Sequence, residues 1–197
     1  LDGPEWKSVP TQSLTVVPPF NKAPRNSTIQ MLHDKSNLYL RMTCELLPDG
    51  KTTFSPQRRD LDLSVHESVE LYLSPAGGRE VSYRFMAGAN AKSGWDAAAG
   101  LITDVMDPRY GRDDTTWNGE WTHQPVVDST RQQWRTLITI PFKTLGVTAP
   151  APGTTWRGNI GRNHQLTQGK MDRAIWSSAI GNTNMNDRSV FGEIVFE

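Results

Sequence analysis

Apolar and polar residues alternate strictly along residues 38–45, LYLRMTCE. The residues that fall on one face of an extended chain are Leu38, Leu40, Met42 and Cys44. This period of two predicts a β-strand that has one face on a core and the other toward water. The polar residues 34–37 before it predict a turn, and residues 29–32 are the expected antiparallel neighbour.

The same period recurs along the rest of the chain. Further strands are expected at residues 69–73, 81–86, 134–140, 156–160 and 190–196, and a short helical turn closed by glycine at 141–146. No window has a helical period long enough for a substantial amphipathic helix. The pattern predicts an all-β fold, a two-sheet antiparallel β-sandwich of the jelly-roll kind, with residues 1–197 as one domain. Two long irregular loops, 47–64 and 88–120, interrupt it, and loops of that length are typical of binding or disorder.

Composition agrees with this fold and narrows the function. The 13 prolines and 16 glycines supply the turns between short strands, and hydrophobic residues make up only 36% of the chain. Basic and acidic residues balance at 21 each, which argues against nucleic acid as a partner. No stretch approaches the roughly 18 apolar residues of a membrane span. Cys44 is the only cysteine, so we expect a buried free thiol and no thiolate zinc site.

Six short motifs then follow one another in a recognisable order. They are Asp2-Gly3 with Glu5-Trp6, and residues 32–40 (LHDKSNLYL), 67–73 (ESVELYL), 134–146, 153–162 and 191–192. Together they resemble the family 9 carbohydrate-binding modules and the wider DOMON-like sandwiches. Two positions depart from that family. Residues 60–66 contain no aromatic ring except His66, where the family has one of two sugar-clamping tryptophans, and Leu137 stands where it often has glutamate.

The resemblance implies a non-catalytic module that holds a poly- or oligosaccharide. It also implies a secreted, cell-surface or periplasmic location, and a larger glycan-active protein in which a glycoside hydrolase or lyase is covalently linked. The chain starts at Leu1 without a signal-peptide pattern, so a mature protein or an excised module is expected. No serine-nucleophile elbow, zinc-protease helix, phosphate-binding loop or dinucleotide motif occurs, which agrees with a module that is not an enzyme.

Aromatic faces and planar polar side chains are the groups that bind sugars, so they are the candidate ligand-binding residues. Arg84 matches an arginine that contacts sugar in the resembling family, and a surface salt bridge with Glu70 is its alternative role. Trp176 and Trp95 lie in polar segments, where each is either a sugar platform or a packing residue. We expect Arg84 and Trp176 to share one glycan-binding surface.

Residues 162–164 complete the candidate set. Arg162 and His164 follow the strand of Trp156, and they either present donors to a ligand or pack within a loop.

Three further interpretations remain open. Structural calcium is one, because sandwich modules often bind it through carboxylates, although solvated turns explain the same residues. Its candidate ligands are Asp60, Asp62, Asp104, Asp107, Asp113 and Asp114. The second is a structural or interaction module with a degenerate sugar site. The third, less favoured, is a haem-binding DOMON-like electron-transfer domain, because methionine and histidine are both available as ligands.

Overall fold

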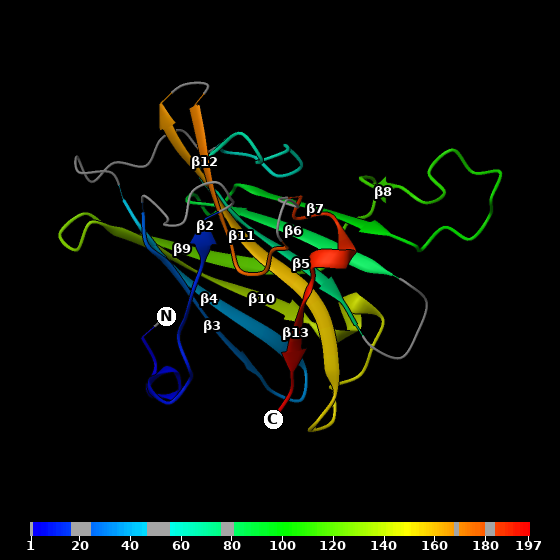
Figure 1. The fold of residues 1–197 in the computed structure, drawn as a ribbon, viewed down its shortest axis with the longest axis horizontal. Coiled ribbons are helices and arrows are strands. Elements are labelled where there is room, and N and C mark those ends of the chain that lie inside the picture. The colour runs from blue at the N-terminus through cyan, green and yellow to red at the C-terminus, as the bar shows by residue number, and fades with distance from the viewer. Residues whose placement is uncertain (1, 17–24, 47–55, 76–80, 168–169, 180–183) are drawn as a thin grey trace.

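The computed structural model describes residues 2–16, 25–46, 56–75, 81–167, 170–179 and 184–197. Two antiparallel sheets stack face to face and form a β-sandwich, which confirms the predicted fold class (Figure 1). Three short 3₁₀ helices, η1 (Pro4–Lys7), η2 (Phe142–Leu145) and η3 (Arg188–Val190), are the only helices in these ranges. None of the helices in the described ranges could cross a membrane.

The smaller sheet has five strands. Their order is β1 (Gln12–Ser13), β3 (Ser27–His33), β4 (Asn37–Glu45), β10 (Gln133–Pro141) and β9 (Thr122–Asp128). Its centre is the pairing of β4 with β10, in which Leu40 lies opposite Ile138. Both strands alternate strictly between buried and partly exposed residues, as the sequence predicts.

The larger sheet has eight strands. Their order is β2 (Thr15–Val16), β12 (Lys170–Ile175), β11 (Thr155–Thr167), β5 (Ser68–Ser74), β6 (Ser82–Gly88), β7 (Gly94–Ala99) and β8 (Asp113–Asp114), with β13 (Gly192–Val195) also pairing with β11. The long strand β11 lies at its centre, because it pairs with β5 on one side and with β12 and β13 on the other.

One hydrophobic core fills the space between the two sheets. The predicted members Leu40, Met42, Val69, Leu71, Ile138 and Ile140 all belong to it. Cys44 is also buried there as a free thiol, as expected, and burial raises the pKa of that thiol to about 11.

Two smaller apolar clusters lie on the other, outer face of the larger sheet. In one, Leu63 packs on β6 and β7, and in the other Met185 and Phe191 pack on β5 and β12. The outer face is therefore partly covered from two sides, by the segments around residues 63 and 185–191. Polar side chains of β5 and β6 lie between these covers.

The expected loop at 88–120 is wrong in part, because β7 and β8 lie within it. Residues 94–98 of β7 are buried on both faces, since Leu63 covers the outer face, and a strand buried on both faces loses the alternating pattern. In the other expected loop, residues 56–64 are irregular, and residues 47–55 lie outside the described part of the chain.

Candidate functional site

A carboxylate and a guanidinium meet on the outer face of the larger sheet. Glu70 of β5 and Arg84 of β6 both point away from the core, and Arg84 Nε donates a hydrogen bond of 2.5 Å to Glu70 Oε1. The side chain of Glu70 is 1% exposed and that of Arg84 is 16% exposed. Burial alone would lower the pKa of Arg84, but the charge of Glu70, the hydrogen bond to Glu70 and smaller contributions from neighbouring groups together outweigh burial and raise that pKa. Arg84 therefore keeps its charge, and of the two side chains only its guanidinium reaches the surface.

Neighbouring side chains hold this pair in place. The Arg84 guanidinium carbon lies 5.4 Å from the ring centre of Tyr72 and 4.9 Å from that of Trp95. The Tyr72 hydroxyl donates to Glu70 Oε1, and Asn163 Nδ2 of β11 donates to Glu70 Oε2 at 3.2 Å. A carboxylate with three donors and a guanidinium between two rings are rigid, which is what a preorganised binding site requires.

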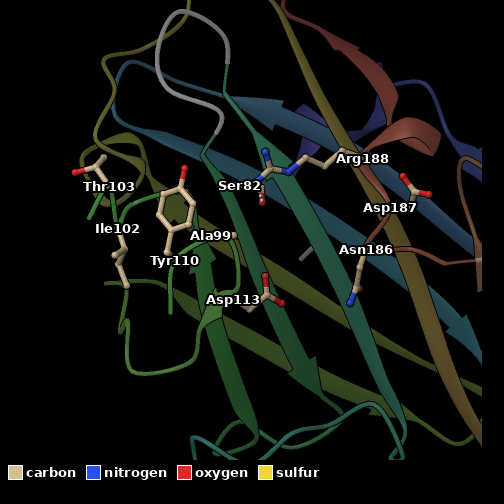
Figure 2. Close-up of a pocket in the computed structure, with 11 residues that line it drawn as sticks. Ser82, Ala99, Ile102, Thr103, Tyr110, Asp113, Asn186, Asp187 and Arg188 are labelled. Carbon is tan, nitrogen blue, oxygen red and sulfur yellow. Dashed lines mark hydrogen bonds between the residues drawn. The ribbon is translucent and has the colours of Figure 1, made fainter. Parts of the chain in front are cut away.

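A cleft of about 670 Å³ opens beside the pair. Figure 2 shows Tyr110 on one side of it and Asn186 and Arg188 on the other, with Ser82 and Asp113 between them. Ser82 lies on β6 two residues before Arg84, and its hydroxyl accepts a hydrogen bond of 3.1 Å from Arg188 Nη2.

Glu70 and Arg84 do not line the cleft themselves, but two of its lining residues lie next to Arg84 and Tyr72. Asp113 Oδ2 is 3.9 Å from Arg84 Nη1, and the Tyr72 hydroxyl contacts Asn186. The lining offers hydroxyl, amide, carboxylate and guanidinium groups together with the Tyr110 ring, which is half exposed. Such a surface has donors and acceptors for a ligand that is rich in hydroxyl groups.

Trp95 lies on β7 and not in the loop that the sequence predicted. Its ring packs with Leu63 and Met86 below the guanidinium of Arg84, and the residue is only 8% exposed. It belongs to the same face as Glu70 and Arg84, where it supports the pair from the side of β7.

The structure separates Trp176 from this face, so the surface that we expected it to share with Arg84 is not formed. Ile175 at the end of β12 packs on Tyr72 at the outer face, and alternation directs the next residue inward. Trp176 therefore packs against the core between the sheets, and its Nε1 donates to Gln12.

Arg162 and His164 lie inside the sandwich, which corrects their expected place at a ligand surface. Strand β11 continues to Thr167, well beyond the predicted end at residue 160, so both residues point inward with Trp156. Both bind Glu67, with 2.8 Å between Arg162 Nη2 and Glu67 Oε1 and 2.5 Å between His164 Nδ1 and Glu67 Oε2. Both side chains are therefore directed at Glu67 in the interior and not at a ligand surface.

Comparison with known proteins gives the fold a name. No protein-family model matches the chain, and no curated protein matches it in sequence. A Bacteroides uniformis protein described as carbohydrate-binding matches in structure with a TM-score of 0.72 and 16% identity, over 96% of this chain and 87% of that one. The fold is that of a family 9 carbohydrate-binding module.

Two solved structures of a family 9 module from Caldicellulosiruptor kristjanssonii support that conclusion. The module in complex with glucose matches with a TM-score of 0.62 and 14% identity, over 99% of this chain and 87% of that one. The module in complex with cellotriose matches with a TM-score of 0.64 and 15% identity, over 98% and 85%. The predicted resemblance to the family 9 fold is thus confirmed at the level of structure.

Several residues at the face of this family 9 fold escaped the sequence analysis. Asn163 lies between the inward residues Arg162 and His164 of β11 and therefore faces outward, beside Glu70. The sequence analysis missed it because it ended this strand at residue 160 and not at Thr167. Tyr72 lies two residues after Glu70 on the same face of β5, so the alternation that places Glu70 on the outer face also places Tyr72 there. Tyr110 and Asn186 come from segments without periodicity, and no sequence pattern indicates them.

The acidic residues considered for calcium do not converge in the described part of the chain. Among all the residues that the structure describes, no group of three or more His, Cys, Asp or Glu side chains is arranged to hold a metal ion. Asp107 and Asp114 both pair with Arg109, and the Arg109 hydrogen bonds lower the pKa of Asp107 to about 2. Calcium binding stays a prediction that rests on the resemblance alone.

Proposed function

We propose that this chain is a non-catalytic module that binds a poly- or oligosaccharide at the outer face of the larger sheet. The observation that carries the proposal is the buried Glu70–Arg84 pair at the edge of a polar cleft. Among the described residues, Arg84 Nη1 and Nη2 have no hydrogen-bond partner, and Asp113 is 3.9 Å from Nη1. A guanidinium with free, fixed donors can bind two neighbouring sugar hydroxyls at once.

The related structures support a neutral glucose-based ligand as the first to test, because two of them hold glucose and cellotriose. Residues 60–66 contain no tryptophan that could clamp a sugar, and the exposed aromatic ring of the cleft is that of Tyr110. Because one ring stacks on less of a sugar than two, we expect a modest affinity for the saccharide. By the same resemblance, we propose that the module belongs to a secreted or surface protein in which a glycoside hydrolase or lyase is covalently linked.

Calorimetric titration of cellotriose into the purified chain tests this proposal. Arg84→Ala and Glu70→Gln each remove part of the pair, and we expect each to weaken binding about tenfold or more, since a charge-assisted hydrogen bond contributes about 1.5 to 3 kcal/mol. Arg135→Ala is the matched control, because Arg135 is 13% exposed and ion-paired with Asp2 on the other sheet.

The proposal fails if Arg84→Ala binds cellotriose like the wild type, or if Arg135→Ala weakens binding equally. A wild-type chain that binds no glycan on an array would favour the structural or interaction module instead. Each variant is first shown to unfold cooperatively, so that lost binding is not lost folding.

A further inference from the structure

A second cleft, of about 510 Å³, shares no lining residue with the first. It lies where residues 57–59 meet the turn between β6 and β7 and the beginning of β9. Its lining contains three cationic side chains, Arg58, Arg59 and Lys92, and the rings of Trp121 and His123. No acidic residue is part of that lining.

Arg59 is the anchored cation of this cleft. Its Nη2 donates to Asp96 Oδ2 at 2.6 Å and to the Gly119 carbonyl at 3.1 Å, and its guanidinium carbon lies 5.3 Å from the ring centre of Trp121. Asp96 is buried behind it and also accepts from Trp121 Nε1 at 2.7 Å. The buried carboxylate balances the charge of Arg59 and fixes its position.

Arg58 and Lys92 have no such balance. Both are exposed, and neither side chain forms an ion pair or hydrogen bond with any residue that the structure describes. The backbone that carries them is nevertheless fixed, because the Asp60 amide donates to the Gly94 carbonyl at 2.8 Å and the Ser93 hydroxyl donates to the Pro56 carbonyl. Since the whole chain has equal numbers of basic and acidic residues, the excess positive charge is local.

We propose that this basic cleft is a second ligand site, which binds the carboxylate or sulfate group of an acidic saccharide. Three cations around one cleft favour an oxyanion, and arginine binds such groups through two parallel hydrogen bonds. The saccharide part of this proposal rests on the proposed function, whereas the binding of an oxyanion does not. The first site takes sugar hydroxyls through Arg84, and the second takes the acidic group of a substituted sugar.

Calorimetry at low ionic strength tests the second site with three probes: a galacturonate trimer, a sulfated oligosaccharide of equal length, and sodium sulfate. The double variant Arg58→Gln/Lys92→Gln removes the two unbalanced charges, and we expect it to bind both acidic oligomers at least tenfold more weakly than the wild type does. The control Lys35→Gln/Arg131→Gln makes the same change of net charge in turns of the smaller sheet and should bind like the wild type. Added salt should weaken wild-type binding.

Equal affinities of the wild type and the double variant for the acidic oligomers would overturn the second site. Sodium sulfate that binds as tightly as the oligomers would overturn its saccharide part. Cellotriose separates the two proposals, because the double variant should keep the wild-type affinity for this neutral sugar. If the wild type does not bind cellotriose, and the double variant binds the acidic oligomers more weakly than the wild type does, the first site is refuted and the second is supported.

Discussion

Arg162 Nη2 lies 2.8 Å from Glu67 Oε1 inside the sandwich, and each side chain is 1% exposed. The same carboxylate accepts from Trp134 Nε1 of the smaller sheet at 3.0 Å and binds His164 of the larger one. A buried charge is costly unless it is paired and hydrogen-bonded. This carboxylate therefore links the two sheets only as long as its partners are all present.

Removing the guanidinium of Arg162 should destabilise the fold strongly. Arg162→Met leaves Glu67 buried without its ion-pair partner, and we expect the free energy of unfolding in urea to fall by about 3 to 5 kcal/mol. Arg135→Met, which breaks the pair with the largely exposed carboxylate of Asp2, should change the free energy of unfolding little. Equal losses for the two variants would contradict this account of the interior pair.

Stability should also depend on the ionisation of Glu67. Burial alone would raise its pKa, but the hydrogen bond from His164 and the charge of Arg162 outweigh burial and lower that pKa below its ordinary value of 4.5. A carboxyl with a lowered folded pKa stabilises the fold above the unfolded value and loses that contribution as the pH falls. The melting temperature should therefore decrease below pH 4.5, and it should decrease less steeply in Glu67→Gln. Parallel profiles for the two proteins would show that another group is responsible.

The strands that the sequence predicted are those along which core residues alternate with residues of another kind, and β5 is one of them although it is buried on both faces. β4 and β10 have one face on the core and one toward water, so their alternation was plain, whereas β7 is covered on both faces and was taken for a loop. Glu70 and Arg84 were found because they alternate with core residues. Arg162 and His164 were misplaced because their partner Glu67 is distant in sequence, and no local pattern shows that a strand directs charges inward.

Gly158 in β11 should tolerate no side chain. A Cβ at this position would lie 2.4 Å from the backbone carbonyl oxygen of Tyr72, a contact that requires β5 or β11 to shift. We expect Gly158→Ala to reduce the free energy of unfolding by about 1 to 3 kcal/mol. Gly94→Ala is the matched control, because its Cβ would be 3.5 Å from the nearest atom of Trp121. A Gly158→Ala chain as stable as Gly94→Ala would refute this.

Trp176 should contribute to stability and not to sugar binding. Trp176→Ala removes a ring that packs against the core between the sheets, and we expect it to cost about 3 kcal/mol of unfolding free energy. The folded fraction of this variant should bind cellotriose with unchanged affinity, measured by calorimetry well below its melting temperature. If Trp176→Ala is fully folded and still binds cellotriose more weakly, Trp176 belongs to the ligand site and this prediction is wrong.

The central pairings of both sheets join distant parts of the chain. Leu40 of β4 lies opposite Ile138 of β10, and Leu71 of β5 lies opposite Ile160 of β11. Long stretches of polypeptide must therefore be ordered before either sheet gains its central contacts, which slows the search for the native topology. We expect refolding on the scale of milliseconds to seconds. During synthesis, β4 and β5 wait for partners made much later, so their unpaired edges are where a nascent chain would aggregate.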